Sequence, residues 1–373
     1  MTSTSLAIPS HLRPSDGRFG SGPTKIRPAQ LAALAATGTS YLGTSHRRDG
    51  VRSVVKRVRD GVAQLFALPD GYEVVLGNGG ATQFWDIATF CLIESRSQHL
   101  AFGEFSSKFA AAVTKATFLE SPTVRSAEPG DAPALVAEDG VDAYCWPHNE
   151  TSTGVMTRVV RPSGAGRDAL TLVDATSGAG GLPVDLTHAD AYYFAPQKAF
   201  ASEGGLWIAV LSPAAIERVG RLVPSRWVPA TLDLSIAIEQ SRLEQTYNTP
   251  ALVTLFLMAE QLDWINGSGG LRWAVERTSD SSSRLYSWAE KSSYAEPFVA
   301  DPAKRSLVVG TIRLHDEIDA GSVTKALRLN GIVDVEAYRA AGYNGLRVGM
   351  FPAIEPADVE ALTACIDWVV DRL

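Results

Sequence analysis

Short apolar runs alternate with amphipathic segments along the first two thirds of the chain. The apolar runs have the length of buried strands, and the segments between them repeat their apolar positions with the period of a helix. This alternation favours an α/β fold in which a mostly parallel sheet carries helices on both faces. We expect strands at 72–76, 97–102, 141–146, 170–174, 191–194 and 206–211, and helices near 83–90 and 107–115.

The pattern changes after about residue 250. Pro250 begins a long apolar helix that should end at Gly267, because proline is favoured in the first turn and glycine just past the last. The remainder predicts a smaller α+β unit, with helices at 271–291, 322–329 and 356–373 and strands at 307–314 and 346–351. We therefore divide the chain into an N-terminal arm (1–15), a large domain (16–267) and a small C-terminal α+β domain (268–373).

Composition narrows the class of protein. Of the 373 residues, 45% are hydrophobic and 20% are charged, which is typical of a globular protein with a full core. The net charge of −7 argues against nucleic acid or an anionic membrane as the partner. No apolar stretch reaches the ~20 residues of a membrane span, and the first residues lack the pattern of a signal peptide.

Three scattered cysteines, Cys91, Cys145 and Cys365, have no paired spacing. This favours a reducing compartment and excludes a disulfide scaffold or a cysteine-rich zinc site. Neither H-E-x-x-H nor G-x-S-x-G occurs, so a metalloprotease or a serine hydrolase is not indicated. We expect a soluble cytoplasmic protein without a metal.

Lys198 ends an apolar run that begins at Ala191. A buried lysine loses hydration, so the pKa of its amine falls and the neutral amine can form a Schiff base with an aldehyde, usually pyridoxal phosphate. A lysine after a strand is by itself more often a solvated charge. Asp174, which ends the preceding strand, changes the balance, because a pyridinium nitrogen needs a fixed anion of that kind.

Three further segments allow two interpretations each. The glycine-rich turn around Gly77–Phe84 could hold an anion, with Thr82 offering a hydroxyl, or could be a tight strand-to-helix turn. Phe105 could stack on a flat heterocycle or fill the core. Thr151 could bind a phenolic oxygen or cap a helix.

The cationic positions are also open. His46, Arg47 and Arg48 form a cluster that could bind a carboxylate or phosphate, or could lie in a solvated loop. Arg347 lies within an apolar strand, where an unpaired guanidinium is too costly to bury. Its anionic partner could be a structural aspartate or the carboxylate of a substrate.

Together these segments resemble the phosphoserine aminotransferases, especially the actinobacterial form. The resemblance covers nearly the whole chain, and the stretches that carry it are 16–23, 43–47, 77–84, 148–154, 174–178, 195–198 and 245–250. The resemblance implies a fold-type I enzyme with a seven-stranded sheet and pyridoxal phosphate, working as a homodimer with shared active sites. It also implies transfer of an amino group between L-glutamate and 3-phosphohydroxypyruvate, which gives phosphoserine and 2-oxoglutarate. This reaction belongs to serine biosynthesis, and 4-phosphohydroxythreonine in pyridoxine biosynthesis is a second expected substrate.

The resemblance assigns cofactor contacts by position. Lys198 would form the Schiff base and then move the proton at the substrate Cα. Asp174 would pair with the pyridinium, Phe105 would stack on the ring, and Thr151 would bind the phenolic oxygen. The phosphate would be held by a further set of residues, the last two of which belong to the other subunit: Ala81, Thr82, Gln197, Asn248 and Thr249.

Substrate contacts follow in the same way. Arg347 would bind the substrate α-carboxylate, while His46 and Arg47 would form part of the pocket for the phosphate or the distal carboxylate. Some relatives have an arginine where this chain has Thr82, and a His-Arg pair shortly before the carboxylate-binding arginine, where this chain reads Arg339–Asn344. The phosphate pocket must therefore be completed by another cation, such as Arg48 or Arg339.

Three alternatives remain open. A transaminase acting on small substrates such as alanine or serine would not require the His46–Arg47 pair. A desulfurase would need a nucleophilic cysteine on a mobile loop, and the three cysteines lie instead in apolar runs. A regulator that keeps the pocket without the chemistry would carry a basic DNA-binding module, and no such module is visible in the sequence.

Overall fold

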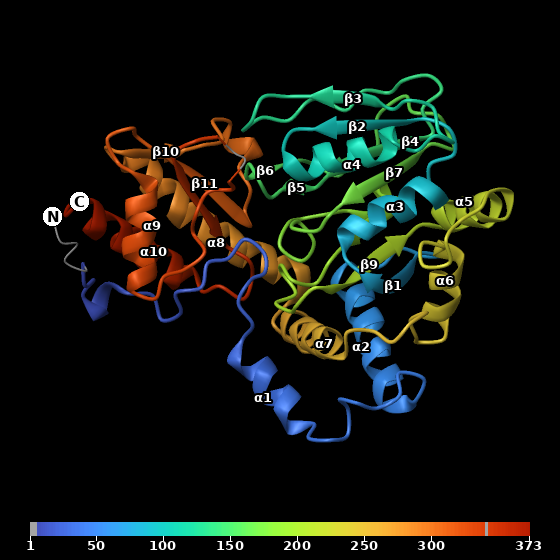
Figure 1. Ribbon diagram of the computed structural model, residues 1–373, viewed down its shortest axis with the longest axis horizontal. Coiled ribbons are helices and arrows are strands. Elements are labelled where there is room, and N and C mark those ends of the chain that lie inside the picture. Colours follow the sequence, from blue (N-terminus) through green and yellow to red (C-terminus); the bar gives the residue numbers. More distant parts are fainter. Residues whose placement is uncertain (1–5, 340–341) are drawn as a thin grey trace.

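The computed structural model describes residues 6–339 and 342–373. Residues 1–5 of the expected arm, together with Ala340 and Ala341 of the segment that replaces the His-Arg pair, lie outside the described residues. The chain forms a large unit built on one sheet and a smaller unit beside it (Figure 1).

A seven-stranded sheet forms the centre of the large unit, in the order β1-β9-β8-β7-β4-β2-β3. The pairs from β8 to β3 are parallel, whereas β9 runs antiparallel to both of its neighbours. The strands are β1 (Glu73–Gly79), β2 (Ser97–Ala101), β3 (Thr123–Ser126), β4 (Ala143–Pro147), β7 (Leu170–Asp174), β8 (Ala191–Phe194) and β9 (Gly205–Leu211). The expected α/β sheet is thus present, and every strand except β9 ends at the same edge.

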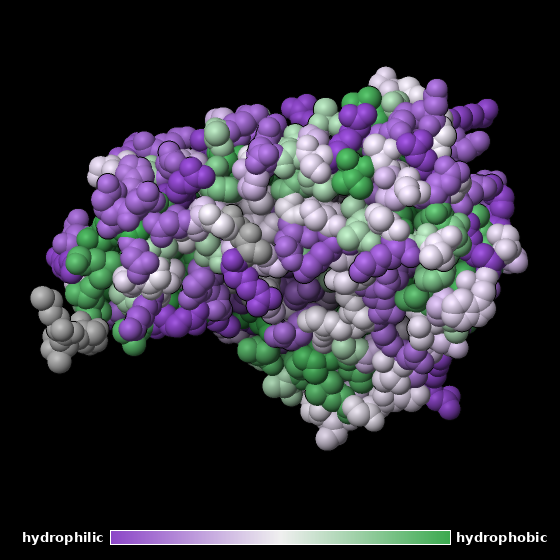
Figure 2. All heavy atoms as spheres, turned by 45° about the horizontal axis from the view of Figure 1, so that its top comes forward, coloured by the Kyte–Doolittle hydropathy of each residue, from purple (hydrophilic) through white to green (hydrophobic). Residues whose placement is uncertain are grey.

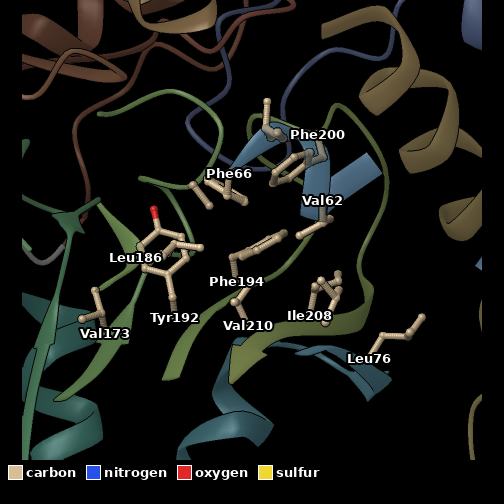
Figure 3. Close-up of a cluster of buried hydrophobic side chains, with 14 of the residues drawn as sticks. Val62, Phe66, Leu76, Val173, Leu186, Tyr192, Phe194, Phe200, Ile208 and Val210 are labelled. Atoms are coloured by element: carbon tan, nitrogen blue, oxygen red, sulfur yellow. The ribbon is translucent and has the colours of Figure 1, made fainter. Parts of the chain in front are cut away.

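Alternation of side chains along the strands divides the core between the two faces of this sheet. Tyr192 and Phe194 of β8 point to one face, together with Ile208 of β9, while Tyr193 and Trp207 point to the other. Figure 3 shows the first face, where Val62 and Phe66 close over the strands. Helices α2 (Asp49–Leu65) and α7 (Leu252–Gly267) cover this face. Helices α3 (Ala81–Cys91), α4 (Glu104–Thr114), α5 (Pro213–Leu222) and α6 (Leu234–Arg242) cover the other.

The smaller unit packs three helices against an antiparallel sheet of order β10-β11-β12. Its strands are β10 (Ala295–Pro297), β11 (Val309–Leu314) and β12 (Gly345–Gly349), and its helices are α8 (Gly270–Lys291), α9 (Ala320–Leu329) and α10 (Pro356–Val370). The remaining elements are helix α1 (Pro28–Ala36), the hairpin β5 (Asn149–Glu150) and β6 (Val155–Met156), and short 3-10 helices at Ser10–Leu12, Leu186–His188, Val223–Ser225 and Pro302–Lys304.

The N-terminal segment is not a free arm in the part that the structure describes. Ile8 and Phe19 are buried in the core of the small unit, because their apolar side chains pack against α8, α9 and α10. Helix α8 contributes Ala274 to the core of the large unit and Leu285 to that of the small one. The division of the chain at residue 268 stays a prediction.

In the described part of the chain, no helix has both the length and the apolar character needed to cross a bilayer.

Candidate active site

Lys198 lies just beyond the end of β8, in a loop that is buried on both sides. Its side chain is about nine-tenths buried, and Nζ donates a hydrogen bond to the carbonyl oxygen of Ser21 at 2.6 Å. Burial and, to a smaller extent, the positive charge of Arg347 lower the pKa of Lys198 to about 7, against the opposing effect of two carboxylates. The amine is therefore available as a neutral nucleophile near neutral pH.

Asp174 ends β7, the strand next to β8. Its Oδ2 accepts a hydrogen bond from Trp85 Nε1 at 2.8 Å, and its Oδ1 accepts from the backbone N and the Oγ1 of Thr176 at 2.9 and 2.6 Å. Burial raises the pKa of Asp174 despite these donors. Among the described residues no salt bridge reaches this carboxylate, so the site holds a fixed, buried acid that a cationic ring nitrogen would complement.

Phe105, Tyr338 and Arg347 form a row at the mouth of the site. The ring centroids of Phe105 and Tyr338 are 5.8 Å apart, and the guanidinium of Arg347 lies 5.2 Å from the centroid of the Tyr338 ring. Arg347 Nη1 donates to the carbonyl oxygen of Thr151 at 3.4 Å, while its Nε is buried without a hydrogen-bond partner.

The anionic partner expected for Arg347 is not a structural aspartate in the described residues, because no salt bridge to it is present there. Burial lowers the pKa of Arg347, which is the effect of a desolvated cation without a carboxylate. An open cavity of about 470 Å³ lies in front of it, lined also by Ser21, Tyr338 and Arg339. The cavity leaves room for an incoming anion beside the guanidinium of Arg347, with Asp334 and Glu336 also on its wall.

The hydroxyl of Thr151 donates to Ser177 Oγ at 2.8 Å. Thr151 follows β5, and Ser177 lies in the turn after Asp174, so the two loops at the ends of β4 and β7 are joined at this point. Thr151 caps no helix, which removes the alternative role considered for it.

Ala81 and Thr82 form the first turn of α3, which begins where β1 ends. No side chain caps this helix, so its first amide groups are available to an anion. The backbone oxygen of Gln197 accepts from Thr24 N at 2.9 Å, and Gln197 Oε1 is buried without a partner in the part of the chain that the structure describes. These groups suit a phosphate at the same edge of the sheet.

The other predicted residues form a second group, on the loop between α1 and α2 and beside the end of β1. His46 Nδ1 lies 3.2 Å from Thr249 Oγ1, and the carbonyl oxygen of Thr249 accepts from Asn78 Nδ2 at 3.1 Å. Asn248 precedes Thr249 and lines a small cavity with Asn78. Within one chain, no hydrogen bond or salt bridge joins this group to the Lys198 amine among the described residues.

Arg47 belongs to the second group and has only neutral partners. Its guanidinium donates to Gln240 Oε1 at 2.6 Å, to Gln245 Oε1, and to the carbonyl oxygen of Tyr247 at 3.0 Å. In the described chain no carboxylate balances its charge, so the side chain is oriented but can still bind an anion. Arg48 is exposed at the start of α2, away from the cavity that Arg339 lines.

Several residues of the site were not predicted from the sequence. The Ser21 carbonyl, Trp85 and Tyr338 contact predicted residues from distant parts of the chain, and nothing in their local sequence indicates this. Thr176 could have been found, because a threonine two residues after an aspartate commonly donates to that carboxylate. No group of described residues forms a metal site.

All three cysteines are buried, and burial raises the pKa of Cys91 to about 12. None is therefore available as the thiolate that a desulfurase needs.

Comparison with known proteins identifies the family. The family described as aminotransferase class-V matches residues 19–361. This chain belongs to that family. The class-V aminotransferase is 65% identical to the phosphoserine aminotransferase of Nocardioides sp. and 63% identical to a putative phosphoserine aminotransferase of Mycolicibacterium vanbaalenii, covering 99% of each chain in both cases.

Solved structures agree in fold with this aminotransferase. The phosphoserine aminotransferase from Cytophaga hutchinsonii superposes with a TM-score of 0.86 at 23% identity, covering 95% of this chain and 99% of the other. The one from Bacillus circulans subsp. alkalophilus gives 0.84 at 21% identity, with 95% and 98% covered. At these identities the likeness shows the fold alone. The predicted fold class and enzyme class are confirmed.

Proposed function

We propose that this chain is a phosphoserine aminotransferase, transferring an amino group between L-glutamate and 3-phosphohydroxypyruvate with pyridoxal phosphate. The observation that carries the proposal is the buried pair of Lys198 amine and Asp174 carboxylate, found in a chain that matches the named relatives over nearly its whole length. The same activity would place the enzyme in serine biosynthesis, with 4-phosphohydroxythreonine as a second substrate to be tested.

The residues present fit the cofactor. With a pKa of about 7, Lys198 offers an amine that is partly uncharged near neutral pH, and Asp174 offers a buried carboxylate that pairs with no cation among the described residues. Phe105 would supply a ring to stack on the cofactor, Thr151 a hydroxyl, and the start of α3, which no side chain caps among the described residues, a set of amide donors. When bound, pyridoxal phosphate supplies an aldehyde for the amine and a ring that withdraws electrons from the substrate.

Lys198 is the group that would move the proton at the substrate Cα. A pKa near 7 lets one amine both accept and return a proton at neutral pH, which is the optimum for general acid–base catalysis. The Ser21 carbonyl holds Nζ in place through its hydrogen bond. Asp174, fixed by Trp85 and Thr176, would hold a proton on the ring nitrogen.

Arg347 would bind the α-carboxylate of either substrate. Among the residues that the structure describes, its Nε has no partner and its Nη1 has only a long contact, so a bidentate bond to a carboxylate would satisfy the guanidinium. Phosphate at the other end of the substrate requires further cations. Arg339 lines the same cavity, and His46 and Arg47 would complete the pocket from a second subunit.

A homodimer would bring the two groups together. The surface around the second group carries exposed apolar side chains, which is unusual for a face in contact with water. Figure 2 shows a hydrophobic area low on the molecule, over α1 and α7. Exposed large apolar residues in this region are Leu31, Leu42, Leu243, Tyr247 and Val253. Pairing of two chains through this face would bury them and deliver Asn248 and Thr249 to the partner's phosphate site.

Turnover of phosphoserine and of serine, each with 2-oxoglutarate, tests the proposed substrate. Phosphoserine should react far faster, because the charges of Arg47 and Arg339 would otherwise have no counterpart in the substrate. Equal rates would reject the assignment and favour a transaminase of small amino acids. Sedimentation of the cofactor-loaded enzyme tests the dimer, and a monomer with full activity would contradict the shared site.

A further inference from the structure

Glu150 is a buried carboxylate that the proposed mechanism does not use. Its side chain is fully buried at the end of β5, one residue before Thr151. No cation forms a salt bridge with it in the part of the chain that the structure describes. A buried acid without a cation is expensive to keep, so its partners indicate what it does.

All the partners of Glu150 donate hydrogen bonds. Oε2 accepts from the backbone N and the Oγ of Ser106, at 2.9 and 2.8 Å. Oε1 accepts from Ser152 Oγ at 2.7 Å, from Ser152 N at 3.2 Å and from Phe105 N at 3.4 Å. This set of donors suits a carboxylate without a proton, and the N-terminus of the eleven-residue helix α4 adds its partial positive charge.

The contacts join two elements that carry predicted cofactor residues. Phe105 and Ser106 belong to the first turn of α4, and Ser152 follows Thr151 in the β5–β6 hairpin. The hydroxyl of Ser152 also accepts from Glu104 N at 3.0 Å, which reinforces the same junction. Glu150 thus fixes the ring of Phe105 relative to the hydroxyl of Thr151.

We infer that Glu150 is a positioning residue of the active site, which sets the geometry of Phe105 and Thr151 and places a negative charge near Lys198. The inference rests on the proposed function for its cofactor geometry, but its electrostatic part concerns the protein alone. The charged groups that act on Lys198 are Arg347 from β12, Asp174 from β7 and Glu150 from β5. The negative charge of Glu150 raises the pKa of Lys198, in opposition to burial and Arg347.

Two substitutions separate position from charge. Glu150→Gln removes the negative charge and places an NH₂ group against the N–H and O–H donors of Phe105, Ser106 and Ser152. Glu150→Asp keeps the negative charge, but its side chain is shorter by one methylene, so the carboxylate lies farther from these donors. Asp142→Asn is the control for loss of a carboxylate far from Lys198. Asp142 also accepts from three backbone N–H groups, those of Glu94, Ser95 and Arg96, but unlike Glu150 it pairs with an arginine, Arg218, at 3.3 Å. It directly precedes β4, at the opposite end of the sheet from Lys198.

The first measurement is the pH dependence of acylation of Lys198 in the apoenzyme, followed by peptide mass spectrometry. In Glu150→Gln the midpoint should move to lower pH, while in Glu150→Asp and Asp142→Asn it should stay at the wild-type value. An unchanged midpoint in Glu150→Gln, whatever its effect on thermal stability, would overturn the inference and leave Glu150 a structural residue.

The second measurement is the kinetics of the cofactor-loaded enzyme. Glu150→Asp should lower kcat by roughly ten- to a hundredfold with a small change in KM, because displacement of cofactor-holding groups by about 1 Å has an effect of that size. Wild-type kcat in Glu150→Asp would overturn the positioning role, even if Glu150→Gln does not fold. Failure of phosphoserine as a substrate would reject the proposed function, yet it would leave the apoenzyme titration unaffected, so the two failures are distinguishable.

Discussion

Gly22 lies against the amine of Lys198, and its replacement by alanine tests the geometry of the site. A Cβ at this position would be 2.0 Å from Lys198 Nζ and 2.3 Å from Cε. Since a carbon and a nitrogen atom in contact lie about 3.5 Å apart, the end of the lysine would have to move by more than about 1 Å. Gly22 also has φ of +131°, which alanine adopts only under strain of roughly 1–3 kcal/mol.

Two consequences are expected for Gly22→Ala. Misplacement of the reacting amine by about 1 Å should lower kcat by about a hundredfold. The backbone strain should lower the unfolding temperature by several degrees, at about 2–4 °C per kcal/mol for a large domain. Single-turnover kinetics with glutamate and thermal unfolding of the apoenzyme measure the two effects separately.

Gly204→Ala is the matched control. Gly204 lies shortly after Lys198 on the chain, its added Cβ would meet no atom within 4 Å, and its φ lies outside the strained region. This variant should behave as wild type. If Gly22→Ala retained full kcat, the position of Nζ beside Ser21 would not be the reactive one, and the reasoning for the site would be refuted.

Further predictions concern the charged groups of the site. Lys198→Ala should still bind the cofactor but lose transamination, measured by absorbance and by turnover; activity near wild type would reject the assignment. Arg347→Lys should raise KM for both amino acids about tenfold or more, because the bidentate contact is lost; an unchanged KM would place the α-carboxylate elsewhere. Arg47→Ala should weaken phosphoserine binding and leave the cofactor spectrum intact, whereas loss of the spectrum would assign Arg47 to the cofactor site. The free energy of unfolding of the apoenzyme should rise with pH from about 7 to 10.5, because in this range the unfolded lysine binds a proton that the folded Lys198 does not; Lys198→Met should remove that part of the slope.

Much of the sheet could be predicted because its strands are buried on both sides and therefore apolar throughout. The predicted strand 170–174 coincides with β7, and Lys198 and Asp174 were found because each follows such a run. Helix α2 was not predicted, although Val51, Val54, Val55 and Val58 carry a clear helical period. Strand β3 could not have been predicted, because none of its four residues is buried and they show no apolar run. These residues form a strand because they pair with β2.

The contacts within the site were harder to predict for a different reason. Ser21 lies far from Lys198 in sequence, and Glu150 contacts Ser106 of α4, which is 44 residues away. These contacts depend on how the loops at one edge of the sheet pack against each other. The local pattern of apolar and polar residues carries no information about that packing. The sequence could indicate that Glu150 belongs to a motif. It could not indicate that the Glu150 carboxylate would accept hydrogen bonds from the backbone N–H groups in the first turn of α4.

The segment around Phe19 and Ser21 has a mechanical consequence. Phe19 is anchored in the core of the small unit, and two residues later the backbone of Ser21 holds the reactive amine in the large unit. Any change in the orientation of the small unit relative to the large unit would therefore displace the acceptor of Nζ, and Arg347 on β12 would move together with it.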